Sequence, residues 1–231
     1  MLAPEMTVEL QRTRDTMRRG ETRILLAKGI DFGRLTRRED GMWDVRQVTG
    51  LPRQSLITAT PIDPPSLLVR PWHQAGNSVS LRDFTSTYHH HHHGIQSTER
   101  FGAGVDPDGD GFSNEMTRAD VAAVTVFQAV MAVPGQVVPN DPEVERAILH
   151  GQRLFSAQPL PRLAPAQPRD EIMMVPAYTD FKLHDASGEA DDMPVESLDV
   201  NWPVWAPKFA VGNRRFLTRR LWGIANSGPY F

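Results

Sequence analysis

Proline and glycine divide this chain of 231 residues into short segments. The chain contains 19 prolines and 17 glycines, more than the roughly 12% that average usage gives for the two together. Proline removes a backbone donor and glycine admits turn conformations, so long regular sheets and long helical bundles are disfavoured. We therefore expect many turns and irregular loops.

Composition and charge exclude several classes of protein. Hydrophobic residues make up 40% and charged residues 23% of the chain, a balance typical of globular domains. The formal net charge is −3, so no basic field attracts a phosphate backbone, and we expect no nucleic-acid partner. The longest apolar stretch, Val121 to Val133, is too short to span a bilayer. The first residues lack the basic start and apolar core of a signal peptide.

The first half of the chain combines one helical segment with strands and loops. Residues 7–19 fit a short helix with Thr7 as its N-cap, a residue type that favours this position. Residues 21–48 have the pattern of strands, and the dipeptide Asp40-Gly41 favours a hairpin turn. The proline-rich stretch from Leu51 to Phe84 is typical of a wrapped loop.

Two better-marked helices are predicted in the second half. Thr117 resembles the start of a capping box before residues 118–132, which are apolar nearly all round and should be buried on most sides. Asp141 is the expected N-cap of residues 142–156, whose apolar residues follow helical spacing. We expect these two helices to pack together.

The segment DPDGDGFSNE, residues 106–115, carries the sharpest chemical signal. Oxygen-bearing side chains at alternate positions of a tight loop suit Ca²⁺. At some positions of such loops the ligand is a backbone carbonyl oxygen in place of a side-chain oxygen. The predicted ligands are Asp106, Asp108, Asp110, Phe112 through its carbonyl, Asn114 and Glu115. The usual position-twelve glutamate is replaced by Thr117, so Glu115 or Asp120 has to complete the shell. The alternative is a surface turn that caps the following helix.

Five consecutive histidines, His89 to His93, lie inside the chain rather than at an end. Neighbouring side chains fan around a helix or alternate along a strand, so two or three of these imidazoles at most can meet one metal or haem iron. A solvated polar segment and a hydrogen-bonding cluster are the alternatives. His184, beside Asp185, is a further candidate for an oriented imidazole; the alternative is a His-Asp pair that caps or ties down a loop.

The chain contains no cysteine. This excludes disulfides, thiolate metal sites, cysteine nucleophiles and covalent attachment of c-type haem. No glycine-rich phosphate loop, nucleophile elbow or zinc-protease helix occurs either. These absences leave no constellation that supports an enzyme of another class.

Residues 68–231 resemble the bacterial di-haem oxidoreductases related to di-haem cytochrome c peroxidases, also called thiol oxidoreductases. The matching segments occur in the family's order. They are LVRPWHQAG, SLRDFT, HHHHHGIQSTERFG, DPDGDGFSNEMTRADVAAVTVFQA, PNDPEVERAILHGQRLF, YTDFKLHD and FLTRRLWGIANSGPYF. The aspartate loop and the histidine-glycine segment are the most specific of these.

The resemblance implies a mainly α fold: a cytochrome c-like helical domain with long irregular loops and a small N-terminal β-hairpin. It divides the chain into an N-terminal region, 1–105, and a cytochrome c-like domain, 106–231, which the family pattern indicates is C-terminally truncated. It also implies a periplasmic location, electron transfer or peroxidase-like chemistry on haem c, calcium near the haem domain, and a redox partner protein or small-molecule substrate that the sequence does not identify.

One departure from the family bears directly on function. Relatives carry a CxxCH haem-attachment motif soon after the segment that ends at Phe155, and this chain does not. Covalent haem is therefore not possible here. Non-covalent haem would use His91, His92, His93 or His184. The alternative function is a haem-free calcium-binding structural or interaction module on the same scaffold.

Overall fold

A computed structural model gives the fold of residues 2–73, 75–131, 140–156, 162–163, 175–176, 179–185 and 215–218. The chain forms two compact units. Unit 1 comprises Met1–Val69, Pro134–Ala186 and Arg215–Phe231, and unit 2 comprises Arg70–Val133 and Ser187–Arg214.

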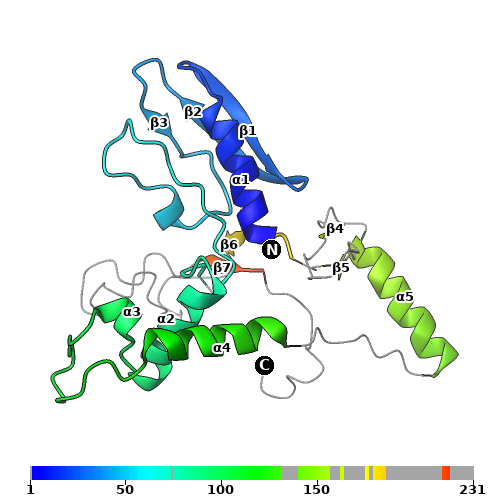
Figure 1. Ribbon diagram of the computed structural model, residues 1–231. Coiled ribbons are helices and arrows are strands. Elements are labelled where there is room, and N and C mark those ends of the chain that lie inside the picture. Colours follow the sequence, from blue (N-terminus) through cyan, green and yellow to red (C-terminus); the bar gives the residue numbers. More distant parts are fainter. Residues whose placement is uncertain are drawn as a thin grey trace. The chain divides into compact units, whose positions relative to one another are not determined.

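Unit 1 is built on a helix and an antiparallel sheet (Figure 1). Helix α1 spans Leu2–Asp15, and the sheet contains β1 (Glu21–Ala27), β2 (Ile30–Arg37) and the short β3 (Trp43–Asp44), in that order. Antiparallel pairing places Glu21 opposite Arg37 and Ala27 opposite Ile30. The sheet lies within residues 21–48, the region predicted to form a hairpin. The turn at Asp40-Gly41 joins β2 to β3, as predicted.

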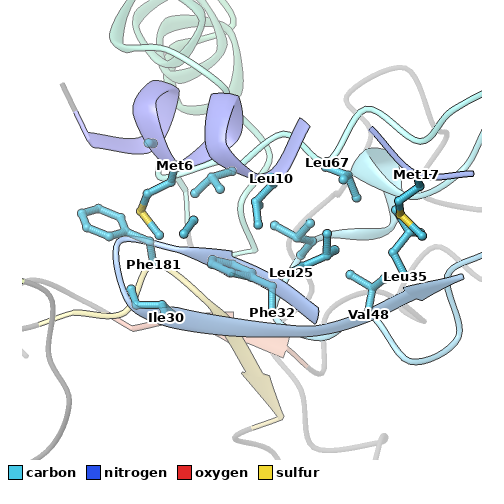
Figure 2. Close-up of a cluster of buried hydrophobic side chains, with 14 residues drawn as sticks. Met6, Leu10, Met17, Leu25, Ile30, Phe32, Leu35, Val48, Leu67 and Phe181 are labelled. Carbon is cyan, nitrogen blue, oxygen red and sulfur yellow. The ribbon is translucent and has the colours of Figure 1, made fainter. Parts of the chain in front are cut away.

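The core of unit 1 lies between α1 and the sheet, as Figure 2 shows. Ala3, Met6, Thr7 and Leu10 are the buried residues of α1, and their spacing is that of one helical face. Phe32 and Leu35 of β2 are fully buried opposite them. Burial of these side chains therefore fixes how α1 lies on the sheet.

The prediction that Thr7 caps a helix at its start is wrong. Thr7 is buried in the second turn of α1, and its Oγ1 accepts a hydrogen bond of 3.0 Å from the Val69 backbone N–H. Pro4 lies in the first turn, where a missing N–H removes no helical hydrogen bond. The helix therefore begins earlier than local capping patterns indicate.

The described part of unit 1 contains further short elements. The 3-10 helix η1 spans Arg53–Ser55, and α5 spans Pro142–Ser156. The side chain of Asp141 accepts a 2.8 Å hydrogen bond from the Glu143 N–H and so caps α5, as predicted. Two small antiparallel pairs join β4 (Arg162–Leu163) to β5 (Val175–Pro176) and β6 (Leu183–Asp185) to β7 (Arg215–Leu217).

The described part of unit 2 contains three helices. These are α2 (Leu81–His93), α3 (Thr98–Phe101) and α4 (Arg118–Val130). The predicted capping box at Thr117 and Asp120 is confirmed. Helix α4 packs on α2, where Gln128 donates a 3.1 Å hydrogen bond to the buried hydroxyl of Thr85.

The expected burial of α4 is wrong. Val121 is its buried residue, whereas Val126, Phe127 and Val130 are 60–73% exposed. Only one face of α4 packs on α2. An apolar sequence on all sides of a helix therefore does not mean that the helix is buried on all sides. The predicted packing of α4 on α5 stays a prediction, because these helices belong to different units.

The predicted mainly α, cytochrome c-like fold class is also wrong. Helix makes up 39% and strand 18% of the described residues, and the five helices there accompany a small antiparallel sheet. The N-terminal region is more than a hairpin attached to a helical domain, because its sheet supplies five of the fourteen buried residues of a hydrophobic core. The predicted division between 1–105 and 106–231 stays a prediction, although unit 2 contains residues on both sides of it.

Candidate metal centre

Three of the six predicted calcium ligands come together in unit 2. Asp106, Asp108 and Asp110 each offer one carboxylate oxygen, and these oxygens all lie within 4.8 Å of one another. Asp106 is half-buried, and the other two side chains are exposed. Three converging carboxylates form a compact site of high negative charge, which suits a hard cation with oxygen ligands.

Backbone hydrogen bonds hold this aspartate loop in shape. The carboxylate of Asp106 accepts from the N–H groups of Gly109 and Gly111, both at 2.9 Å. Both glycines have positive φ, 73° and 92°, a conformation that side chains with a Cβ rarely adopt. The hydrogen bond from the Gly111 N–H is the largest effect and lowers the pKa of Asp106; burial opposes it, and the hydrogen bond from Gly109 adds to the lowering. Asp106 therefore stays ionised near neutral pH.

Asn114 and Glu115 face other partners. The Oδ1 atom of Asn114 accepts from Thr98 Oγ1 at 2.9 Å, and Oε2 of Glu115 accepts from the Gln96 N–H at 2.7 Å. The Phe112 side chain is 70% exposed, and the predicted role of this residue concerns its carbonyl. Asp120 is engaged in the capping box of α4. The structure thus separates a carboxylate triad from residues that anchor the loop.

The base of the aspartate loop is closed by a contact that the sequence analysis missed. Ser97 and Met116 form a parallel bridge, in which the N–H of Thr98 donates to the Met116 carbonyl at 2.9 Å. Thr98 and Asn114 are sixteen positions apart in the chain, so no local spacing signals their pairing. This anchor fixes both ends of the loop and leaves its aspartates at the tip.

The histidine run forms the last turns of α2, and Gly94 caps the helix with φ 73°. His91, His92 and His93, three of the predicted haem ligands, are exposed. His90 is half-buried, with its ring 4.8 Å from that of Phe101. Burial, then the nearby charges of Arg100 and His91, lower the pKa of His90, while Asp108 opposes this shift.

His184, the fourth predicted haem ligand, lies in β6 of unit 1. Its Nε2 lies 2.6 Å from Oδ2 of Asp180, four residues earlier in the chain. Burial raises the pKa of Asp180, but hydrogen bonds from Thr218, the Lys182 N–H and His184 outweigh it and lower the pKa. His184 is therefore oriented by a carboxylate, in a unit separate from the histidine run.

The residues described do not fit a haem group. The chain has no cysteine for thioether bonds, and the four candidate histidines are exposed and divided between two units. A haem iron needs ligands beside a large apolar surface that covers the macrocycle. We therefore derive no chemistry through haem.

No protein-family model, curated protein or solved structure matches this chain. Among the residues with described placement, none of the helices is long and apolar enough to cross a membrane.

Proposed function

We propose that this protein is a calcium-binding module, in which the carboxylates of Asp106, Asp108 and Asp110 hold one Ca²⁺ ion. The convergence of their oxygens within 4.8 Å carries the proposal. Ca²⁺ takes six to eight oxygen ligands in flexible geometries, and backbone carbonyls and water complete such shells. Mg²⁺ demands a tighter octahedron and keeps more of its water, so this exposed loop favours Ca²⁺.

The role of the ion is structural. Three ionised carboxylates in one loop repel one another, and a bound dication removes this repulsion. The loop lies between α3 and the N-terminus of α4, and its base is already closed by the bridge between Ser97 and Met116. Calcium would therefore stiffen the loop tip and, through it, the start of α4. The module would present a rigid surface to a partner when calcium is bound.

The oxidoreductase function implied by the family resemblance stays a second proposal without a mechanism. The resemblance in residues 68–231 supports it, and the missing cysteines and exposed histidines count against it. No described arrangement of residues supplies peroxidase-like chemistry without haem.

Calorimetric titration with Ca²⁺ tests the calcium proposal. We expect one binding event in the intact protein, and a loss of about a hundredfold in affinity when Asp108→Asn and Asp110→Asn are combined, because two of three ligand charges disappear. Asparagine keeps the side-chain shape, so the loop backbone can persist.

The matched control combines Glu143→Gln with Glu145→Gln, which changes the net charge equally on the exposed face of α5. We expect this control to bind Ca²⁺ as tightly as the intact protein does. Absence of heat with the intact protein, or equal weakening in both double variants, would contradict a site built by the triad.

A further inference from the structure

The side of α4 that packs on α2 is partly polar. Val121, Thr125 and Gln128 are spaced i, i+4 and i+7, so they lie on one side of the helix. Val121 is fully buried. Nε2 of Gln128 donates to the Thr85 hydroxyl of α2 at 3.1 Å, and the Thr125 hydroxyl lies 3.4 Å from the same oxygen. Helix α2 therefore meets this side of α4.

The opposite side of α4 carries a continuous apolar stripe. Its members are all exposed, and they are Ala119, Ala123, Val126, Phe127 and Val130. Successive residues turn by about 100° around a helix, so these five share one face that points away from the side packed on α2. The three large members are 60–73% exposed, and residues 121–131 include no charged side chain. We call these five residues the α4 stripe. An exposed apolar patch of this kind marks an interaction surface.

The spacing of the α4 stripe fits a second helix as its partner. Ala119, Ala123, Val126 and Val130 are separated by four, three and four positions, which is the a and d pattern of helices that pack side by side. Phe127 borders this seam and widens the apolar area. Such a face packs on another helix at a shallow angle, because the side chains of each helix fill the gaps of the other.

The sizes of the side chains fit a second copy of α4 that runs in the opposite direction. The two alanines lie in the first half of the helix, and the large residues lie in the second half. A two-fold axis that passes between Ala123 and Val126 brings these residues of opposite copies together. It also places Ala119 of each copy opposite Val130 of the other. Each large side chain then meets a small one, whereas a parallel pair would crowd one end and leave a gap at the other.

Electrostatics also favours the antiparallel pair. The last turn of α4 has no basic side chain, so the partial negative charge at this end of the helix lies beside the partial positive end of the second copy. The two stripes together would bury on the order of 1,000 Å², which is the size of a weak, reversible interface.

We propose that the α4 stripe is the contact surface of a homodimer, in which two copies of α4 pack antiparallel about a two-fold axis. The small contact area predicts a reversible dimer with a Kd of about 1–100 μM. The proposal goes beyond calcium binding and does not rest on it, because the stripe consists of side chains of α4 alone.

Sedimentation velocity of the full chain, from about 1 to 200 μM, tests the proposal. Val126→Lys combined with Val130→Lys should weaken dimerisation more than about tenfold, because it places charges at the centre of the contact. Both valines are largely exposed in one copy, so the fold of unit 2 does not depend on them. The matched control, Val144→Lys with Leu149→Lys, adds the same charges to exposed positions of α5. It should change the Kd less than about threefold.

Cysteine pairs test the direction of the two helices, because the chain has no cysteine of its own. A mixture of the Ala119→Cys and Val130→Cys proteins should form a mixed disulfide on mild oxidation. Neither variant should pair with itself, because copies of one position lie about 16 Å apart along antiparallel helices, beyond the reach of a disulfide. A chain that stays monomeric, equal weakening in both lysine variants, absence of the mixed disulfide, or self-pairing of either cysteine variant would overturn the proposal.

Discussion

Replacement of Thr7 by valine tests the packing of α1 most directly. Thr7 is 6% and Val69 3% exposed, and the Thr7 hydroxyl accepts the Val69 N–H at 3.0 Å across 62 residues of chain. Valine keeps the shape of threonine and opens no cavity. It leaves a buried N–H without an acceptor, at a cost of about 1–3 kcal/mol. We therefore expect Thr7→Val to lower the free energy of unfolding of unit 1 by about 2 kcal/mol.

Thr7→Ser is the matched variant, because it keeps the hydroxyl and removes one methyl group. Its cost should be about 1 kcal/mol. Amide hydrogen exchange measures both effects, since the slowest amides of β1 and β2 report global unfolding and the Val69 amide reports its own hydrogen bond. Val69 should exchange faster in Thr7→Val than in Thr7→Ser. Equal protection of Val69 in the two variants, with no change in the strand amides, would refute this reasoning.

Two further predictions concern unit 1. Gly33→Ala should destabilise the unit by more than about 3 kcal/mol in urea unfolding, because a Cβ there would lie 2.1 Å from the Gln47 carbonyl oxygen at a φ of +82°. Gly29→Ala has the same φ class but open space, so it should cost only about 1–2 kcal/mol, and equal costs would contradict the predicted clash. Arg46 hydrogen-bonds Asp44 and lowers the pKa of Asp44 to about 2. NMR titration should show this midpoint move upward in Arg46→Gln, and an unchanged midpoint would argue against the ion pair.

Local chemistry was predictable from the sequence because its partners lie within a few residues. Asp141 caps α5, and Thr117 with Asp120 caps α4, since each of these hydrogen bonds spans four residues or fewer. The alternating aspartates of the loop also follow from local spacing. The turn at Asp40-Gly41 is another case in which two residues determine the backbone.

The hydrogen-bond partners of several polar side chains were not predictable from the sequence. His184 pairs with Asp180, four residues earlier in the chain, and Phe181 between these two residues has a positive φ of 56°. Asn114 and Glu115 face the segment around Thr98 instead of the aspartate triad. In each case a neighbouring segment offers a partner that the spacing of residues does not reveal.

The sequence by itself determined the caps of α4 and α5, the turn at Asp40-Gly41 and the spacing of the aspartate triad. Only the tertiary structure decided which surfaces are buried. In that structure Thr7 of α1 is buried, whereas Phe127 of the apolar helix α4 is exposed. The reason is physical: a cap or a turn is complete within one stretch of backbone, whereas burial depends on which distant segment packs against a given face.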